Sequence, residues 1–334
     1  MIHTTDTSLT EVSNINIKSE IDVSIIIVNY NTRQLTLDCL ASVYASKTSY
    51  QFELIVVDNA SRDDSVQAIQ TMYPGVRMIA NSGNTGFAVA NNQGMDVASG
   101  RYMLLLNSDT VVQPDTLQTM ISFMDRHPEM GASGCKVILP DGSLDKACKR
   151  GFPTPSASFY YAFGLSRLFP DQPKFNQYQL GHLSPDDEYP VDCLVGAFML
   201  VRREAINQVG GLDETFFMYG EDIDWCYRIK EAGWGIYYYP RTYIVHYKGG
   251  SARRKPLKIT YEFHRAMWVF HRKHYAKKYN LLMNSAVYMG ISLKFTLSLV
   301  RSWLPLPSRS KKSTMSTTHT STRTENEVSS EVKS

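Results

Sequence analysis

The sequence predicts an α/β protein with a mostly parallel central sheet, flanking helices and a helical extension at its carboxyl end. Three observations support this class. Short aliphatic runs, each about the length of one strand, recur through the first third of the chain. Stretches with helical periodicity separate these runs, and such alternation is typical of parallel sheets. Polar residues directly follow several of the runs, where parallel sheets hold their ligands.

Four strands and three helices are expected in the first third of the chain. The strand at 23–28 is a β-branched run, which indicates burial on both faces of a sheet. Further strands are expected at 54–57, 76–79 and 102–106. The first helix would carry its apolar stripe on Leu37, Leu40, Ala41 and Tyr44. The second would begin at a turn with a built-in cap, 58–61, and end before Pro74, and the third would cover 86–98.

The middle of the chain is less regular. Pro114 opens a helix that is expected to continue to about His127, because proline is favourable in a first helical turn. Residues 140–192 are rich in Pro, Gly, Tyr and Phe and predict long loops, which are usually functional in a compact domain. Beyond them we expect a strand at 197–201, a helix at 221–232, a strand at 236–239 that Pro240 ends, and a short strand at 242–245.

Composition divides the chain into four parts. Residues 1–20 and 307–334 are polar, and both are expected to be disordered. Residues 21–255 would form the α/β domain, and 256–306 would add a basic, aromatic helix followed by an apolar one. A spanning helix requires ~20 predominantly apolar residues, and Lys294 would lie near the bilayer centre. We therefore expect the apolar segment to lie in the membrane interface, with packing back on the domain as the alternative.

Charge and cysteine content exclude several classes of protein. The net charge of +3 gives no sign of nucleic-acid binding. Basic residues gather between Arg253 and Lys278, which favours either an anionic neighbour, such as a phosphate or membrane surface, or a solvated helix face. The five cysteines include no C-x-x-C pair and are expected to be reduced thiols. Residues 1–20 lack the apolar core of a signal peptide, so a cytoplasmic location is expected.

Two strand ends carry candidate metal ligands. Asn107-Ser108-Asp109 follows the strand at 102–106, and an aspartate there can hold a divalent cation that bridges a diphosphate and stabilises its departing charge. An ordinary turn would contain the same residue types. His246 follows the strand at 242–245 in a similar place. A lone histidine is more often structural, but as a ligand it would favour manganese over magnesium.

Three acids lie within four residues in the segment Glu221-Asp222-Ile223-Asp224. Acids complement the dipole at the amino end of a helix, so a purely structural role is one interpretation. The bulky aromatic residues around the segment favour another. A partly dry setting raises the affinity of a carboxylate for protons, and such a group suits a general base.

An ordered series of motifs resembles the family 2 inverting glycosyltransferases of the GT-A fold, especially the bacterial rhamnosyltransferase-like branch. The series covers roughly residues 22–250 and is far more specific than any one piece. It consists of VSIIIVNYN at 23–31, IVVDNAS at 55–61, NSGNTGFA at 81–88, LLNSD at 105–109, GAFMLVRR at 196–203 and FFMYGEDIDWC at 216–226. The resemblance implies a Rossmann-like sheet for 21–255 and a single displacement that inverts the anomeric centre.

The resemblance also implies the chemical roles of individual residues. Asp222 would be the catalytic base, and Glu221 would hold the acceptor or orient that base. Asp109 would bind a divalent metal, Mg²⁺ or Mn²⁺, with His246 as a second ligand. Asn107 stands where the family has the first Asp of its D-x-D motif, and it would contact ribose or metal through a neutral oxygen.

A further set of residues is implied in binding the nucleotide. These residues would line the base pocket, contact the base or ribose, or shape the neighbouring wall: Val28, Tyr30, Asp58, Asn84, Gly86 and Asn107. Arg253 and Arg254 could close over the diphosphate as a mobile loop, or could belong to a solvated surface.

The rhamnosyltransferase-like branch favours L-rhamnose from dTDP-rhamnose as the transferred sugar. The acceptor would be a saccharide or a polyprenyl-diphosphate-linked saccharide in cell-envelope polysaccharide synthesis. Such an acceptor would explain peripheral contact with the inner face of the cell membrane.

Two other functions share parts of the pattern. One is a catalytically inactive nucleotide-sugar or glycan-binding protein of the same fold, which intact Asp109, Asp222 and His246 disfavour. The other is a nucleotidyltransferase. That function would require a Gly- and Lys/Arg-rich signature after the first strand, and residues 29–32 do not supply one.

Overall fold

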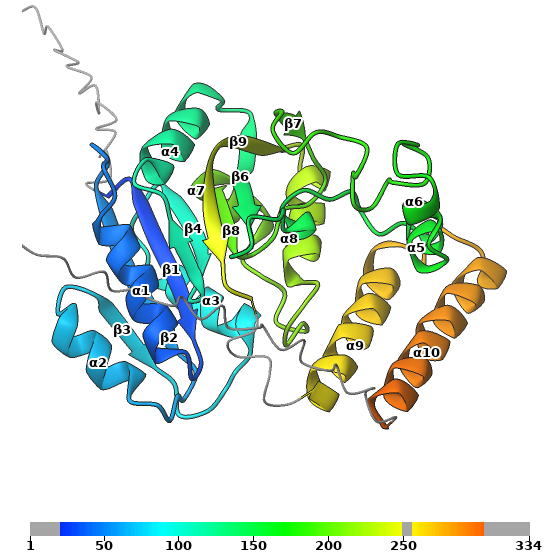
Figure 1. Cartoon of the computed structure of the whole chain (residues 1–334), viewed down its shortest axis with the longest axis horizontal. Helices are drawn as coiled ribbons and strands as arrows, with labels where there is room; N and C mark the ends of the chain where they lie inside the picture. Colours follow the sequence, from blue (N-terminus) through cyan, green and yellow to red (C-terminus); the bar gives the residue numbers. More distant parts are fainter. Residues whose placement is uncertain (1–20, 249–255, 304–334) are drawn as a thin grey trace, which may run out of the picture.

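The computed structural model describes residues 21–248 and 256–303 (Figure 1), so both predicted disordered ends lie outside the described residues. In the described part, nine strands form one sheet in the order β3-β2-β1-β4-β8-β6-β9-β5, with β7 paired to β9. The strands are β1 (Val23–Asn29), β2 (Phe52–Asp58), β3 (Arg77–Ala80), β4 (Tyr102–Asn107), β5 (Thr110–Val112), β6 (Met130–Ile138), β7 (Tyr189–Pro190), β8 (Phe198–Arg202) and β9 (Gly235–His246).

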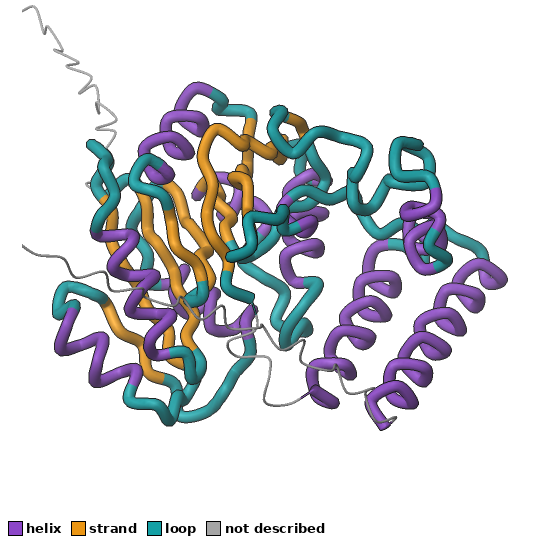
Figure 2. Tube along the Cα trace, in the orientation of Figure 1, coloured by secondary structure: helices purple, strands orange, loops and turns teal. Residues whose placement is uncertain are grey.

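Helices flank this sheet, and two more stand beyond α8 at the end of the molecule opposite α2 (Figure 2). The helices are α1 (Arg33–Tyr44), α2 (Ser65–Met72), α3 (Phe87–Asp96), α4 (Thr116–Arg126), α5 (Pro155–Ala162), α6 (Leu165–Leu168), α7 (Arg203–Val209), α8 (Glu221–Glu231), α9 (Pro256–His274) and α10 (Leu281–Trp303), with a 3₁₀ turn η1 at Lys146–Cys148. The predicted α/β class with carboxyl-terminal helices is confirmed.

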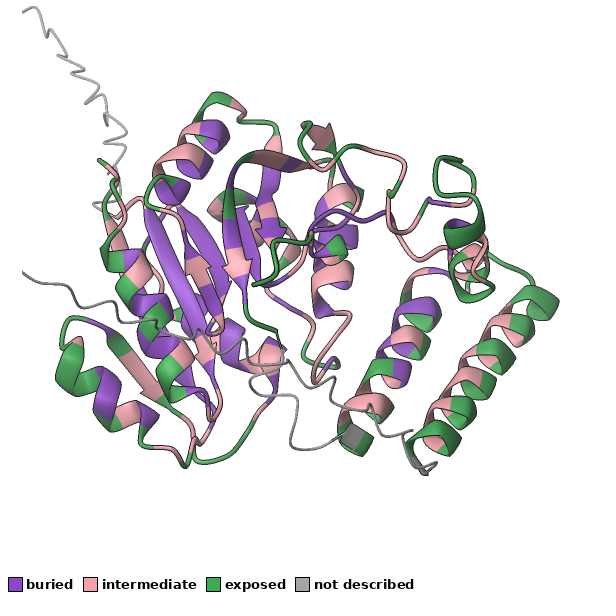
Figure 3. Ribbon diagram, in the orientation of Figure 1, coloured by how far each residue is buried: buried purple, intermediate pink, exposed green. Residues whose placement is uncertain are grey.

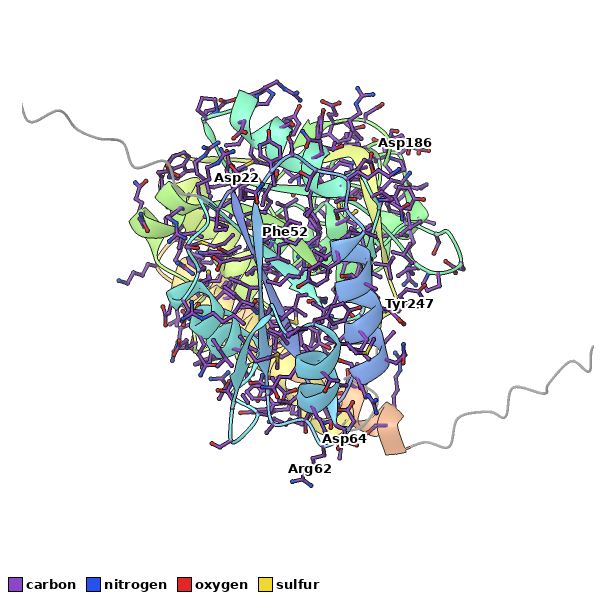
Figure 4. The ribbon with its side chains drawn as sticks, turned by 90° about the vertical axis from the view of Figure 1, so that its left-hand side faces the viewer. Asp22, Phe52, Arg62, Asp64, Asp186 and Tyr247 are labelled. Carbon is purple, nitrogen blue, oxygen red and sulfur yellow. The ribbon has the colours of Figure 1, made fainter. Side chains whose placement is uncertain are left out.

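The four amino-terminal strands are parallel and bring their polar ends to one edge of the sheet. β1 pairs in parallel with both β2 and β4, and β2 pairs in parallel with β3. Figure 4 shows Asp22 and Phe52, where β1 and β2 begin, at one end of the molecule. Arg62 and Asp64, which follow the end of β2, lie at the opposite end. In register, Asn29 pairs with Asp58, so the predicted polar residues meet where these strands end.

β9 is longer than expected, because Pro240 does not end it. Gly235–His246 is one strand that pairs in parallel with β6. The register of that pairing shifts between Gly134 and Lys136, opposite residues 238–243. Pro240 falls inside this irregularity, and a bulge tolerates the missing N–H of a proline. A single strand therefore runs through to His246.

The first two helices also differ from the prediction. The buried residues of α1 are Thr36, Leu37, Cys39, Leu40 and Val43. Ala41 and Tyr44 are exposed, because the face of α1 that covers the sheet is rotated away from them. α2 begins at Ser65, so the turn at 58–61 does not cap it. The carboxylate of Asp58 instead accepts a hydrogen bond from the backbone N–H of Ser61 at 2.8 Å and closes the turn itself.

Strand β6 was not predicted, because its sequence MGASGCKVI contains small residues that are poor strand formers. Its glycines are needed for close packing. A Cβ atom at Gly131 would lie 2.6 Å from Cβ of Trp234, and one at Gly134 would lie 2.7 Å from a Leu194 methyl carbon. The same small residues that obscure the strand in the sequence let neighbouring side chains reach the sheet.

Helix α9 is attached to α8 by an ion cluster and by a second apolar core. Asp224, which is fully buried, accepts from His274 Nε2 at 2.6 Å and from Arg228 Nε at 2.8 Å, and Lys273 Nζ lies 2.7 Å away. Burial disfavours the charged carboxylate, yet the hydrogen bonds from His274 and Lys273 lower the pKa of Asp224 to about 2. The charged Asp224 carboxylate therefore serves to attach α9 to α8. The second core consists of Phe216, Tyr227, Ala266, Val269, Phe270 and Tyr275.

Helix α10 packs along α9 and contacts it through polar and aromatic side chains. His271 Nε2 lies 2.8 Å from the amide oxygen of Asn284, and the amide nitrogen of Asn284 donates to the Ala276 carbonyl at 2.8 Å. The rings of His264 and Phe295 are 5.3 Å apart. Among the described residues, no helix combines the length and the apolar character that crossing a bilayer requires.

Candidate active site

A buried hydrogen-bond network fixes the ends of β1 and β2. The amide nitrogen of Asn29 donates to Asp58 at 2.6 Å and to the Ser61 hydroxyl at 3.0 Å. The amide oxygen of Asn29 accepts from the hydroxyls of Thr32 at 2.7 Å and Thr36 at 2.8 Å. Each of these polar atoms has a partner, so the network costs little to bury and holds Asp58 in one orientation.

The loop that precedes α3 forms a wall beside this network. The backbone N–H of Gly86 donates to the side chain of Asn84 at 3.0 Å, and Asn59 donates to the Gly86 carbonyl at 3.0 Å. Gly86 has a φ of +94°, and a Cβ atom there would lie 2.6 Å from the Phe217 carbonyl oxygen. Phe87 N–H donates to that same oxygen at 2.8 Å. The wall is thereby joined to the segment that leads into α8.

Val28, Tyr30 and Asn107 lie around the end of β1. Val28 pairs in register with Val57 on one side and with Asn107 on the other, and both Val28 and Tyr30 are half-buried. The backbone N–H of Asn107 donates to the Ala197 carbonyl at 3.1 Å. The structure therefore brings all six residues implied in nucleotide binding to the carboxyl ends of β1, β2 and β4 or to the loop beside them.

Asp109 and His246 meet at a second corner, together with an acid that the sequence did not single out. The Asp109 carboxylate lies 3.2 Å from His246 Nε2, and the Asp145 carboxylate lies 3.2 Å from Nδ1 of the same ring. Lys248 Nζ donates to Asp145 at 2.7 Å. Burial disfavours the charged ring, yet the hydrogen bonds with Asp109 and Asp145 raise the pKa of His246. Asn107 lies beside the ring, with its amide nitrogen 3.4 Å from Nε2.

The chemistry of this corner fits a divalent metal. Asp109 offers carboxylate oxygens and His246 offers Nε2, while Asp145 at Nδ1 would orient the ring from behind. In the described ranges, there is no group of three or more His, Cys, Asp and Glu side chains that could hold a metal ion. Two protein ligands would therefore need phosphate oxygens to complete the shell, which is common for cations that bind nucleotide diphosphates.

Asp109 also borders a pocket of about 390 Å³. Its walls come from α1, from β5 and from Tyr247, which Figure 4 shows beside α1. None of the residues implied in nucleotide binding lines this pocket. It is thus a separate hollow behind the metal corner, and we assign no substrate to it.

Arg150 connects the metal corner to the acidic pair of α8. It lies five residues beyond Asp145, and its guanidinium donates to Asp222 at 2.6 Å and to the Leu194 carbonyl at 2.7 Å. The backbones of Arg150 and Cys193 bond to each other in both directions, at 3.0 and 2.8 Å. Arg150 is 9% exposed, so this is a largely buried ion pair. The other carboxylate oxygen of Asp222 accepts from the N–H of Ile223 at 2.8 Å.

Glu221 occupies a different environment from its neighbour. Its side chain is 6% exposed, and Oε2 has no hydrogen-bond partner among the described residues. Burial, with the negative charge of Asp222 as a second cause, raises the pKa of Glu221 to about 8. Burial thus favours the protonated form of Glu221, whereas the neighbouring Asp222 carboxylate is ion-paired with Arg150.

Two positively charged residues that the sequence suggested for the diphosphate, Arg253 and Arg254, lie outside the described residues. Asp145 and Arg150 were missed. Both lie in the irregular region 140–192, where no periodicity marks a residue as buried. Their immediate stretch, PDGSLDKACKR at 140–150, contains five charged residues, so charge alone does not distinguish these two from their neighbours.

Comparison with known proteins gives two family matches. Residues 24–210 match the model of Glycosyl transferase family 2, and residues 180–249 match a model described as the N-terminal domain of galactosyltransferase. The N-acetylglucosaminyl-diphospho-decaprenol L-rhamnosyltransferase of Mycobacterium tuberculosis is 30% identical over 234 residues, covering 67% of this chain and 75% of the relative. The rhamnosyltransferase WbbL of Escherichia coli is 31% identical over 234 residues, covering 67% and 83%.

Solved structures share the fold at lower identity. The mannosyltransferase PcManGT from Pyrobaculum calidifontis, solved with GDP-Man and Mn²⁺, superposes with a TM-score of 0.52 at 16% identity, over 84% of this chain and 74% of that one. TarS residues 1–349 from S. aureus gives a TM-score of 0.51 at 16% identity, over 88% and 76%. At this identity the likeness bears on the fold alone, and it confirms the GT-A class.

The raised pKa of Glu221 predicts a pH dependence of stability. Between its unfolded pKa near 4.5 and its folded pKa of about 8, the folded state holds a proton that the unfolded state has lost. Stability therefore falls as pH rises through this window. We expect the free energy of unfolding of the wild type to decline relative to Glu221→Gln, by up to about 1.4 kcal/mol per pH unit.

Urea unfolding of both proteins between about pH 5 and pH 8 measures this difference. Asp96→Asn, which removes an exposed carboxylate of α3, controls for the loss of one charge. Parallel stability curves for the wild type and Glu221→Gln would show that Glu221 is ionised throughout.

Proposed function

The chain belongs to glycosyl transferase family 2, and on that premise we propose that it transfers L-rhamnose from dTDP-rhamnose, with inversion, to a lipid-linked saccharide. Its relatives named as rhamnosyltransferases support the choice of sugar. The name of the mycobacterial relative, which specifies a diphospho-decaprenol, supports the choice of acceptor class. The chain is a glycosyltransferase. Other relatives are named for O-antigen and teichuronic acid biosynthesis, which supports a role in cell-envelope polysaccharide synthesis. The donor, the acceptor and the stereochemistry are our proposal.

One observation carries the proposal: the short segment from Asp145 to Arg150 contacts both the metal corner and the acidic pair. Asp145 holds the His246 ring, and Arg150 holds Asp222. A transfer reaction needs a place for the leaving diphosphate and a base for the acceptor hydroxyl within reach of the same sugar. A protein that only bound nucleotide sugars would have no need to position an acid pair in this way.

We propose that the nucleoside lies along the ends of β1, β2 and β4. Asp58, oriented by Asn29, would accept hydrogen bonds from the base or ribose, and Val28 and Tyr30 would flank the base. Asn84 and Gly86 would form the wall beside it. The diphosphate would then reach Asp109 and His246, with Asn107 between the nucleoside and the metal corner. A divalent cation held there would supply positive charge against the departing diphosphate.

Asp222 is our proposed catalytic base. It would take the proton from the acceptor hydroxyl while the acceptor oxygen bonds to the anomeric carbon. The bond from that carbon to the diphosphate oxygen breaks, and the nucleoside diphosphate leaves with the electron pair. Attack opposite the leaving group inverts the centre. Arg150 would keep the Asp222 carboxylate in place, since it bonds to one of its oxygens at 2.6 Å.

Glu221 would position the acceptor. With its pKa raised to about 8, it carries a proton at neutral pH and can donate as well as accept a hydrogen bond. Its Oε2 has no partner within the described residues, which leaves it available to a sugar hydroxyl. The two neighbouring carboxyl groups would thus have separate roles because their environments differ.

The outer side of α10 supports contact with a membrane surface. Seven of its exposed positions form an apolar stripe: Leu282, Ala286, Met289, Gly290, Leu293, Leu297 and Val300. The one charged residue exposed on the described part of α10 is Arg301, in its last turn. Figure 3 shows this helix exposed along most of its length, whereas α9 carries buried residues. Lys294 lies on the opposite, inner side, where its ammonium is 5.5 Å from the Phe263 ring centroid. The helix can therefore rest in the interface without burying a charge in lipid.

The transfer reaction tests the proposed base. With dTDP-rhamnose, Mn²⁺ and a farnesyl-diphosphate-linked N-acetylglucosamine, Asp222→Asn should lower kcat by at least about a thousandfold, because the amide cannot take the hydroxyl proton. The affinity for dTDP, measured by calorimetry, should change less than about twofold. Asp96→Asn, which alters an exposed carboxylate of α3, is the matched control.

The wild-type product should carry the anomeric configuration opposite to the donor, as read by NMR. Retention of configuration would overturn the single displacement. Substantial turnover by Asp222→Asn would remove Asp222 from the role of base.

The apolar stripe predicts a loss of membrane binding when it is charged. Leu293→Glu should reduce binding to vesicles that contain anionic lipid by about tenfold, because the carboxylate would have to leave water or lift the helix. Met72→Glu is the matched control, since Met72 is 57% exposed and Leu293 is 62% exposed, and α2 lies at the other end of the molecule. Co-sedimentation measures both variants, and equal binding by the two would contradict the interfacial role.

A further inference from the structure

A second pocket, of about 250 Å³, opens between α9, α10 and the turn that precedes α8. Its lining is mixed aromatic and polar: Tyr219, Ile259, Thr260, Phe263, His264, Lys294 and Ser298. This lining contains a lysine and a histidine and no carboxylate. The pocket therefore favours an anionic or neutral occupant over a cationic one.

Lys294 gives the pocket its charge. Its ammonium lies 5.5 Å from the ring centroid of Phe263 and 6.0 Å from that of Tyr161. Within residues 21–248 and 256–303, no carboxylate pairs with it. Burial lowers the pKa of Lys294, which shows that part of its hydration has been lost without an ion pair in return. A half-buried, unpaired ammonium is costly, and an anionic ligand would offset that cost.

His264 adds a directional group to the same pocket. The ring is 6% exposed, and Nδ1 lies 2.7 Å from the Thr260 carbonyl, an acceptor, so Nδ1 carries the proton. Nε2 has no hydrogen-bond partner in the described part of the chain. Once protonated, this nitrogen can donate to a phosphate oxygen. A buried polar atom without a partner, in the wall of a pocket, indicates a ligand that completes it.

The turn before α8 places this pocket next to the acidic pair. Tyr219 forms part of its wall and has a φ of +71°, a left-handed conformation that side chains rarely adopt. Gly220 follows with a φ of +86°, and a Cβ atom there would lie 3.1 Å from the Phe216 ring and 3.2 Å from Ala266. The strained turn thus holds Tyr219 against α9 and leads directly into Glu221.

We propose that this pocket binds the phosphate group of a prenyl-diphosphate-linked acceptor, with Lys294 and His264 as its contacts. The proposal rests on the proposed function, which it deepens by assigning the acceptor a subsite. Two features of α10 determine the class of ligand. Its inner side offers the Lys294 cation to phosphate, and its outer side offers an uncharged apolar stripe to a hydrocarbon chain. The saccharide would then extend past Tyr219 toward Glu221 and Asp222.

Calorimetry with farnesyl diphosphate tests the subsite without any transfer reaction. Lys294→Gln should raise the Kd by about tenfold, since it removes one charge-assisted contact. His264→Gln should weaken binding in the same direction. Lys277→Gln, which removes an exposed lysine in the turn after α9, is the matched control and should bind as the wild type does. Equal Kd values for the wild type and Lys294→Gln overturn the proposal.

Steady-state kinetics distinguish the loss of this subsite from a general loss of activity. Lys294→Gln should raise KM for farnesyl-diphosphate-linked N-acetylglucosamine about tenfold with little change in kcat, and leave KM for octyl N-acetylglucosaminide, which has no phosphate, unchanged. Equal effects on the two acceptors overturn the assignment.

Vesicles of anionic phospholipid distinguish a headgroup site from an acceptor site. If Lys294→Gln weakens vesicle binding and leaves the acceptor KM unchanged, the pocket holds a phospholipid and the proposal is wrong. A wild type that binds farnesyl diphosphate through Lys294 yet transfers no sugar would instead contradict the proposed function alone.

Discussion

The short segment from Asp145 to Arg150 is the constraint on which the rest of the site depends. At one end Asp145 holds the His246 ring, and at the other Arg150 holds Asp222. Between them, η1 and the backbone pairing of Arg150 with Cys193 leave the segment little freedom. Because β9 carries His246 and α8 carries Asp222, a loop segment about 70 to 100 residues earlier in the chain fixes these two consecutive elements relative to each other.

This arrangement explains how adjacent acids can have different roles. Asp222 faces a guanidinium, Glu221 faces a dry surface without a partner, and Asp224 is surrounded by cations from α8 and α9. Of the three acids, only Asp224 has a purely structural role. It attaches the carboxyl-terminal helices, and those helices form the second pocket and the apolar stripe. The three acids at the start of α8, which form one cluster in the sequence, therefore lie in three different electrostatic environments.

Much of the fold and part of the site could be predicted from sequence. The buried strands could be predicted because aliphatic runs have an unambiguous pattern. Asp58, Asn107 and Asp109 could be chosen as candidates because they lie where such runs end, and their roles stay predictions. Asp145 and Arg150 could not be found in this way, since loop residues have no periodicity and their partners are about 70 to 100 residues distant. Pro240 misled the prediction because a β-bulge, which only the pairing with β6 reveals, accommodates it.

The most direct test of the account is a double-mutant cycle on kcat/KM for sugar transfer, with Asp145→Asn and Arg150→Gln singly and together. If one rigid segment positions both the metal corner and the base, the second substitution should cost much less in a chain that already carries the first, with a coupling of at least about 1 kcal/mol. Effects that add within about 0.5 kcal/mol would show two independent sites and would contradict the account.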